Sequence, residues 1–369
     1  MQTVLVSGGG TAGPVLAHWL LHRGFAPTVV ERAPGPRPGG QAVDVRGVAL
    51  DVVERMGLLE QVRDVRTRMR GMSVLAPDGR ELHRSTESTF SSGRLDNDDV
   101  ELLREDLVRI VYEHTRADVE YVFGDSVTAL DEHGEGVRAD FAHGPSRGFD
   151  LVIGADGLHS AVRRLVFGPE ERFAHPLGSG LAVFGADNFL GLRDWQLWLR
   201  DGEEGFGILP VRGNTELRIA FGFRSAPRPT DHRDDGSLQR YVAGRLASMR
   251  WEGARLSEAA RQATDFYGDA MAQIRMAHWS RGRVALLGDA GYCPSPLSGQ
   301  GTSLALTGAY VLADCLARTP GDHRTAYARY EQRMRPYVAL NQSLATENPT
   351  GPASEESVTR AKNALTLDD

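Results

Sequence analysis

The first thirty residues show two short apolar runs that flank a helical pattern. The run Thr3–Val6 has the composition of a buried strand. From residue 12 to residue 23 apolar side chains recur every three or four positions, and Gly24 provides a helix end. Thr28–Val30 then predicts a second buried strand, which ends at Glu31. A strand, a helix and a strand in this order predict a parallel sheet.

The same reasoning predicts the elements that follow. We expect amphipathic helices at Ala49–Leu59 and Leu102–His114, and a hairpin at Met72–Leu82. Further buried strands are expected at Phe149–Ala155 and Val284–Leu287, and a long apolar helix at Thr302–Leu316. Residues 171–275 instead alternate apolar and polar side chains, which predicts a mostly antiparallel sheet, with helices at Leu238–Met249 and Ser257–Thr264. The polar tail after Pro349 is expected to be loosely ordered. The fold class is therefore α/β, with a parallel sheet, a smaller antiparallel sheet and a C-terminal helix.

Composition narrows the class of protein. The chain has 369 residues, 41% hydrophobic and 25% charged, which suits a soluble protein of two domains or one large domain. No apolar stretch is long enough to span a membrane, and no signal-peptide pattern is present, so we expect a cytoplasmic protein without membrane partners. The net charge of −7 argues against nucleic-acid binding.

The side chains also exclude several chemistries. Lys362 is the only lysine among 42 lysine and arginine residues, which excludes a catalytic lysine in the body of the protein. The two cysteines cannot form a disulfide framework, and the histidines show no metal-ligand spacing, so no metal is expected. We interpret Cys293 as a small buried thiol rather than as the attachment point of a covalently bound cofactor.

A glycine-rich motif follows the first predicted strand. Gly8, Gly10 and Gly13 form a GxGxxG pattern, which also contains Thr11 and Ala12. In such a turn the glycines allow a sharp bend, a close approach to a pyrophosphate and tight packing of the next helix. Glu31 ends the following strand, where an acidic residue can hold ribose hydroxyls. The alternative is a glycine-rich turn with a surface glutamate.

Two later segments repeat the strand-to-turn arrangement. Residues 150–163 form a strand, an Asp156-Gly157 junction and a helix. Residues 283–290 form a strand that ends in Gly288-Asp289, and Asp289 can accept from a ribitol or ribose hydroxyl. Pro296 and a Gly-Gln-Gly turn follow, and the turn's amides, at a helix N-terminus, can stabilise negative charge on a reduced flavin (Gly299, Gln300, Gly301).

These three motifs, in this order across residues 3–316, resemble the FAD-dependent class A monooxygenases, typified by para-hydroxybenzoate hydroxylase, aromatic polyketide hydroxylases and tetracycline-inactivating monooxygenases. The resemblance implies a Rossmann-type FAD-binding domain, formed by residues 1–71, 98–170 and 276–349. It also implies a substrate-binding domain, formed by residues 72–97 and 171–275, before a polar tail at 350–369.

The resemblance implies further cofactor contacts. Arg104 matches the family's arginine on the helix after the first substrate-domain hairpin, Arg46 lies where the mobile-flavin loop would run, and Arg32 follows Glu31. Three positions depart from the family pattern, because Tyr292 replaces a histidine, Ser303 an asparagine and Gly308 an aspartate.

The implied activity is hydroxylation of an electron-rich, aromatic or polycyclic small molecule, with non-covalent FAD, NADPH or NADH as transient reductant, and O2. Oxygen would be transferred from a flavin C4a-hydroperoxide, and the sequence nominates no catalytic side chain. The alternatives are a reductase, a cyclase or a redox-silent FAD-binding protein on the same scaffold. The oligomeric state, monomer or dimer, stays open.

Aromatic residues of the antiparallel region are candidates for the substrate pocket, although each can equally belong to the core: Trp195, Trp198, Phe206 and Phe221, with Phe184 and Phe223 nearby in sequence.

Overall fold

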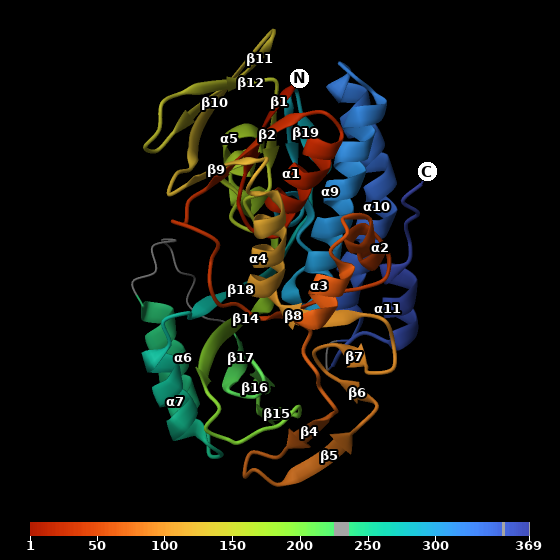
Figure 1. Cartoon of the computed structure of the whole chain (residues 1–369). Helices are drawn as coiled ribbons and strands as arrows, with labels where there is room; N and C mark the ends of the chain where they lie inside the picture. The colour runs from red at the N-terminus through yellow and green to blue at the C-terminus, as the bar shows by residue number, and fades with distance from the viewer. Residues whose placement is uncertain (225–235, 349–350, 369) are drawn as a thin grey trace.

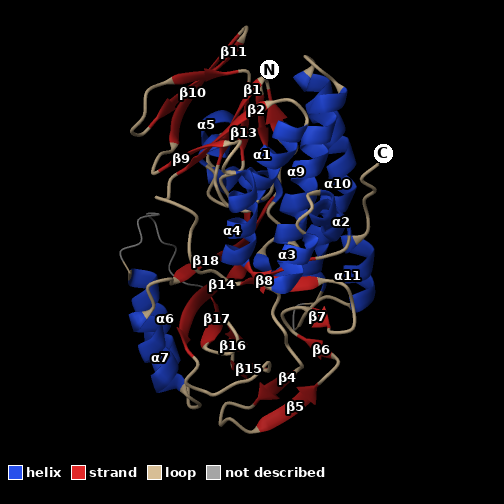
Figure 2. Ribbon diagram, in the orientation of Figure 1, coloured by secondary structure: helices blue, strands red, loops and turns tan. Residues whose placement is uncertain are grey.

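The computed structural model describes residues 1–224, 236–348 and 351–368. The chain has two parts (Figure 1): a parallel sheet with long helices fills the upper part of the view, and a second large sheet with two outer helices fills the lower part. Strands of both sheets and the helices around them are distinguished by colour in Figure 2.

The upper sheet has six strands in the order β19-β20-β13-β1-β2-β9. Strand β1 lies between β2 and β13 and pairs with both in parallel register. The strands are β1 (Thr3–Ser7), β2 (Ala26–Glu31), β9 (Glu120–Phe123), β13 (Leu151–Gly154), β19 (Ser280–Arg281) and β20 (Val284–Leu286). The predicted parallel sheet is confirmed, but the expected strand from Phe149 is shorter, because Phe149 belongs to a different sheet.

Helices cover this sheet and form most of its core. The buried helix α9 packs against both α1 and α10. The helices of this part are α1 (Ala12–His22), α2 (Val48–Arg55), α3 (Leu59–Asp64), α4 (Arg104–Thr115), α5 (Ala161–Phe167), α8 (Asp289–Tyr292), α9 (Gly301–Arg318), α10 (His323–Glu347) and α11 (Glu355–Lys362), with short 3-10 turns at Glu170–Arg172 and Pro296–Ser298.

Three expectations for these helices need correction. The single helix expected at Ala49–Leu59 is two helices, because Gly57 adopts a φ of 73° and breaks it. The helix expected from Leu102 begins at Arg104, since Leu102 lies in a strand. The tail expected to be loosely ordered forms α11, and residues 349, 350 and 369 lie outside the described residues.

The lower sheet has seven strands in the order β18-β14-β17-β16-β15-β4-β5. All pairs are antiparallel except β15 with β4, so the prediction of a mostly antiparallel sheet is confirmed. The strands are β4 (Met72–Leu75), β5 (Glu81–Ser85), β14 (Ala174–Asp187), β15 (Gln196–Asp201), β16 (Glu204–Val211), β17 (Glu216–Arg224) and β18 (Tyr267–Ile274). Helices α6 (Ser237–Ala247) and α7 (Gly253–Gln262) lie on its outer side and share a buried apolar core with it (Figure 1).

Three small sheets complete the fold. Strands β10 (Val127–His133), β11 (Gly136–Phe141) and β12 (Arg147–Phe149) form one, and β6 (Ser88–Thr89) pairs with β7 (Gly93–Arg94). Between the two large sheets, β3 (Ala42–Val45) pairs with β8 (Val100–Leu103), which places Asp44 directly opposite Glu101. Within the described residues, every helix is too short or too polar to cross a membrane.

Candidate cofactor site

The glycine-rich turn connects β1 to α1 and leaves little room for side chains. Gly8 has a φ of 116°, and a Cβ atom there would lie 2.4 Å from the Ala155 carbonyl oxygen. A Cβ atom at Gly13 would lie 1.9 Å from the Gly8 carbonyl oxygen, whereas one at Gly10 would meet nothing within 4 Å. The turn is therefore closed toward the sheet and open at Gly10, where Thr11 precedes the first residue of α1, Ala12. This is the geometry that a pyrophosphate requires.

Glu31 ends β2 beside this turn. Its carboxylate is buried and accepts hydrogen bonds from the backbone N–H groups of Gly9, at 2.7 Å, and Ala33, at 2.9 Å. Each oxygen keeps a lone pair for a further donor, such as a sugar hydroxyl. Arg32, which follows, is exposed.

Asp156 has local hydrogen-bond partners. It accepts from the Ser160 hydroxyl and, at 3.0 Å, from the Val162 N–H, and burial raises its pKa. Asp156 thus holds the turn that starts α5, next to the Gly8 turn.

Asp289 faces a recess between the motifs. Its side chain is exposed, yet the protein around it desolvates the carboxyl group and raises its pKa. The neighbouring glycines join the segments, since a Cβ atom at Gly288 would lie 3.4 Å from that of Ala12 and one at Gly301 would lie 3.9 Å from Asp289 Oδ1. Tyr267 of β18 behaves in the same way, because it is 43% exposed while desolvation and the charge of Asp289 raise its pKa. An exposed carboxyl and an exposed phenol that the surrounding protein desolvates indicate a concave surface at this position.

The Gly-Gln-Gly turn starts α9. The exposed Pro296 opens the 3-10 turn before it, Gly299 adopts a φ of 64°, and α9 begins at Gly301. Gln300 is fully buried, and neither its amide oxygen nor its amide nitrogen has a hydrogen-bond partner. A buried amide without partners is costly, so this side chain is placed to bind a polar group that enters the site.

Arg46 lies against this turn. Its backbone N–H donates to Ser303 Oγ at 3.0 Å, and the guanidinium donates to Asp44 at 2.8 Å. A Cβ atom at Gly299 would lie 3.8 Å from the Arg46 guanidinium. Asp44 Oδ1 and Arg46 Nε are also buried without partners, so the unsatisfied polar atoms converge on one place.

Arg104 begins α4 and reaches the loop before β3. Its guanidinium donates to the Gly39 carbonyl at 3.2 Å, and burial lowers its pKa. The structure therefore brings Arg104 toward the site.

Two departures from the family pattern are linked in space. A Cβ atom at Gly308 would lie 2.2 Å from the Tyr292 hydroxyl, which also shares a hydrogen bond of 2.8 Å with the Tyr330 hydroxyl. Tyr292 therefore fits only because position 308 has no side chain. Cys293 is buried, and desolvation raises its pKa, as a core thiol requires.

The aromatic candidates form two groups, namely the phenylalanines of one buried cluster and the two tryptophans. Phe206 and Phe221, with Phe184 and Phe223, are buried in the core under α6 and α7, in agreement with the core alternative stated for each of them. Trp195 donates to Ser73 at 2.9 Å and packs under Arg84. Trp198 donates at 3.0 Å to the buried Gln196, which donates to Ser91 in turn.

The sequence reasoning missed Asp44, Glu101 and Gln196. Asp44 was visible as the residue two before Arg46, and Glu101 as a lone acid in an apolar strand. The signal in both cases is a charged residue in a buried strand, which requires a partner or a ligand.

The fold and the site together define a dinucleotide-binding protein with a second sheet over the cofactor domain. Residues 1–341 match the family described as FAD binding domain, and the chain belongs to this family. A Mycobacterium tuberculosis protein named as uncharacterised is 48% identical over 371 residues and covers all of both chains. A flavin-dependent monooxygenase of an unknown prokaryotic organism is 40% identical over 343 residues, which are 93% of this chain and 88% of the relative.

Solved structures agree with this family. The crystal structure of the tetracycline destructase Tet(55) matches with a TM-score of 0.87 and 36% identity, and the match covers 100% of this chain and 99% of that one. The protein is an FAD-dependent oxidoreductase of the flavin-dependent monooxygenase type. The open glycine turn, Glu31, the recess at Asp289 and the unsatisfied amide of Gln300 all fit FAD.

Proposed function

We propose that the protein uses NAD(P)H and O2 to hydroxylate an electron-rich polycyclic small molecule of polyketide type, with FAD bound non-covalently. The observation that carries this proposal is the convergence of buried, unpartnered polar atoms of Asp44, Arg46 and Gln300 at the start of α9. The contacts of Arg46 with Ser303 and Gly299 support a site at this end of α9, where a cofactor ring and a substrate could meet.

Each part of the chain has a role in this proposal. Bound FAD supplies hydride acceptance and the activation of O2. The Gly8–Gly13 turn and Glu31 hold the dinucleotide, Asp289 holds its sugar alcohol, and the amides that begin α9 stabilise negative charge on the ring. Arg46 fixes the loop beside the ring.

The substrate class draws on the full-length similarity to Tet(55), which is named a tetracycline destructase. Tetracyclines are fused-ring compounds with phenol and enol groups, which are electron-rich at carbon. We therefore propose that this protein acts on a fused-ring phenol or enol.

The test measures NADPH and NADH consumption by the FAD-loaded protein with tetracycline and a panel of polycyclic phenols. We expect at least one compound to stimulate consumption and to gain the mass of one oxygen atom. Peroxide measurement separates coupled hydroxylation from oxidase activity. Stimulation by no member of the panel, or products without added oxygen, would contradict the proposal.

A further inference from the structure

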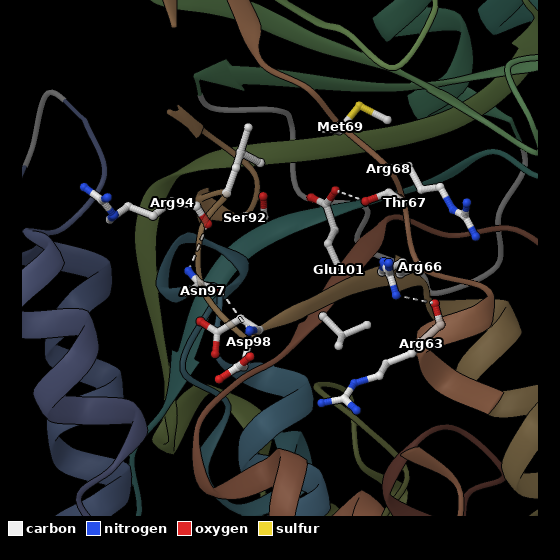
Figure 3. Close-up of a pocket in the computed structure, with 13 residues that line it drawn as sticks. Arg63, Arg66, Thr67, Arg68, Met69, Ser92, Arg94, Asn97, Asp98 and Glu101 are labelled. Carbon is white, nitrogen blue, oxygen red and sulfur yellow. Dashed lines mark hydrogen bonds between the residues drawn. The ribbon is translucent and has the colours of Figure 1, made fainter. Parts of the chain in front are cut away.

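A pocket opens beside the β3–β8 pair, between α3 and the loop that follows β7 (Figure 3). Its volume is about 540 Å³, enough for a fused-ring molecule, and its walls come from residues 63, 66–69, 92, 94–95 and 97–101. In Figure 3, Arg63, Arg66 and Arg68 lie on one side of the pocket and Arg94 on the other, with Glu101 between them.

Glu101 is a buried carboxylate that lacks a full set of partners. Its Oε2 accepts from the Thr67 hydroxyl at 2.5 Å, whereas Oε1 is buried without a hydrogen-bond partner. Only 6% of the residue is exposed, although it lines the pocket. A buried carboxylate oxygen without a partner is costly, so a donor that reaches it from the pocket would be bound favourably.

Asp44 lies directly across the β3–β8 ladder from Glu101, and it too has one unpartnered oxygen. Arg46 is the one cation bonded to Asp44 among the described residues, while Asp99 of the same region is paired with Lys362 at 2.7 Å. Two buried carboxylates thus share one buried cation, an arrangement that favours binding of one proton by the pair.

The electrostatics follow from this burial. Desolvation raises the pKa of Asp44 to about 7, with the charge of Glu101 acting in the same direction and Arg46 against it. Desolvation also raises the pKa of Glu101, while the nearby Ser91 and Thr67 hydroxyls and Arg46 act against the rise. A general base works best when its pKa lies near the working pH.

The arginine side of the pocket indicates the charge of the ligand. Arg68 has no ion pair or hydrogen bond among the described residues, and Arg66 donates only to the Arg63 carbonyl at 3.3 Å. Exposed guanidinium groups beside a concave site attract anions and stabilise an oxyanion that forms there.

We propose that Glu101 is the proton acceptor for a phenolic or enolic hydroxyl of the substrate, backed by Asp44 across the β3–β8 ladder. This inference rests on the proposed function. The proton moves from the substrate oxygen to Glu101 Oε1, and the electron pair of the broken O–H bond stays on that oxygen. The resulting oxyanion raises the electron density on the neighbouring carbon, so that this carbon can attack the oxygen that is transferred. The proton returns to the product oxygen at the end of the turnover.

The first experiment compares Glu101→Gln with Glu258→Gln, a matched change on the exposed face of α7. With tetracycline or the best compound of the panel, we expect Glu101→Gln to lower kcat near neutral pH by roughly 10² to 10⁴-fold, with a smaller effect on KM and unchanged FAD content. The deficit narrows as the pH passes the pKa of the substrate hydroxyl, because an ionised substrate needs no base. Glu101→Asp restores part of the activity. A deficit that is constant with pH, or loss of FAD, would assign Glu101 a structural role instead.

The second measurement detects ionisation of the bound compound's hydroxyl in the absence of turnover. The absorbance spectrum of the bound compound, taken without NADPH, should show the ionised hydroxyl in the wild type and the neutral hydroxyl in Glu101→Gln. The same spectrum in both proteins would overturn the proposal.

A third measurement separates failure of this inference from failure of the proposed function. If the wild type turns over no compound, the proposed substrate class fails, and Glu101 is judged by infrared difference spectra of the wild type against Glu101→Gln and Asp44→Asn. A protonated carboxyl band that titrates near neutral pH and is altered in both variants supports the shared proton. Absence of such a band contradicts it.

Discussion

The two sheets of this protein use their side chains in opposite ways. In the half that contains the parallel sheet, which we propose binds FAD (the cofactor half), the candidate site depends on backbone geometry and a few carboxylates, at Gly8, Gly13, Glu31 and Asp289. In the half that contains the second large sheet, which we propose covers the substrate (the substrate half), four of the aromatic candidates fill the core under α6 and α7. Sequence motifs therefore point to a cofactor whose phosphates bind at turns more readily than to a substrate that binds to side chains on a sheet.

The largest expected effect comes from a substitution in the glycine-rich turn, and it tests whether the tight packing of this turn's backbone is required in the cofactor half. Gly13→Ala places a Cβ atom 1.9 Å from the Gly8 carbonyl oxygen, which the turn cannot absorb. We expect loss of bound FAD and a fall in the free energy of unfolding of about 3 kcal/mol or more. Gly10→Ala is the matched control, because its Cβ atom meets nothing within 4 Å. It should leave the apoprotein stable and weaken only FAD, as measured by denaturation and by flavin absorbance per protein.

The next prediction concerns a single carboxylate of the same half. Asp289→Ala removes a charged acceptor, which is worth roughly 1.5–3 kcal/mol, so the Kd for FAD should rise roughly 10- to 100-fold. Flavin fluorescence on dilution measures this change.

Acid precipitation of the wild type should release FAD into the supernatant, whereas flavin in the pellet would indicate a covalent link and contradict the assignment of Cys293 as a core thiol.

The contact between Tyr292 and Gly308, which both depart from the family pattern, can be tested within the core. Gly308→Ala brings a Cβ atom to 2.2 Å from the Tyr292 hydroxyl and should destabilise the fold by about 1–3 kcal/mol. Adding Tyr292→Phe removes the hydroxyl and should recover part of this loss. Gly244→Ala in α6, where a Cβ atom meets nothing within 4 Å, is the control and should be neutral or stabilising. Additive effects in the double variant would show that the two positions are independent.

A pH-dependent contact joins the two halves. His159 before α5 bonds to Asp269 of β18 at 2.8 Å and to Glu170 at 2.9 Å, which raises its pKa from 6.5 to about 9. Because the folded pKa is the higher one, the stabilisation is complete below pH 6.5 and is lost as the pH rises toward 9. We expect a loss of about 1–2 kcal/mol over this range after solvent screening. Urea denaturation at both ends of the range should show a flatter profile for His159→Gln, and equal profiles would refute the contact.

The smallest effects separate the two tryptophans of the substrate half. Trp198→Phe leaves the oxygen of the buried Gln196 without its donor, which costs about 1–2 kcal/mol. Trp195→Phe removes a hydrogen bond to Ser73 at a half-buried position and should cost less than about 1 kcal/mol. Thermal denaturation with FAD bound measures both, and equal losses would mean that Gln196 does not depend on Trp198.

The sequence predicted those features that depend on local pattern. The strand–helix–strand unit from Thr3 to Glu31 and the Gly299–Gly301 turn follow from spacing, because each motif fixes its own backbone. The pairing of β3 with β8 joins residues nearly sixty positions apart, so the Asp44–Glu101 opposition depends on tertiary structure. The same holds for Asp99, which accepts from the Gly47 N–H and from Lys362.

The pairing of Lys362 with Asp99 has a practical consequence. The only lysine of the chain is 14% exposed at its side chain and is held at the end of α11 against the loop that contains Arg46 and Gly47. Amine-specific reagents modify a shielded, ion-paired ammonium slowly, so the rate at which Lys362 is acylated reports how often α11 detaches. A mass spectrometer can thus follow the opening of this helix at one defined atom, in the presence or absence of FAD and substrate, without any engineered label.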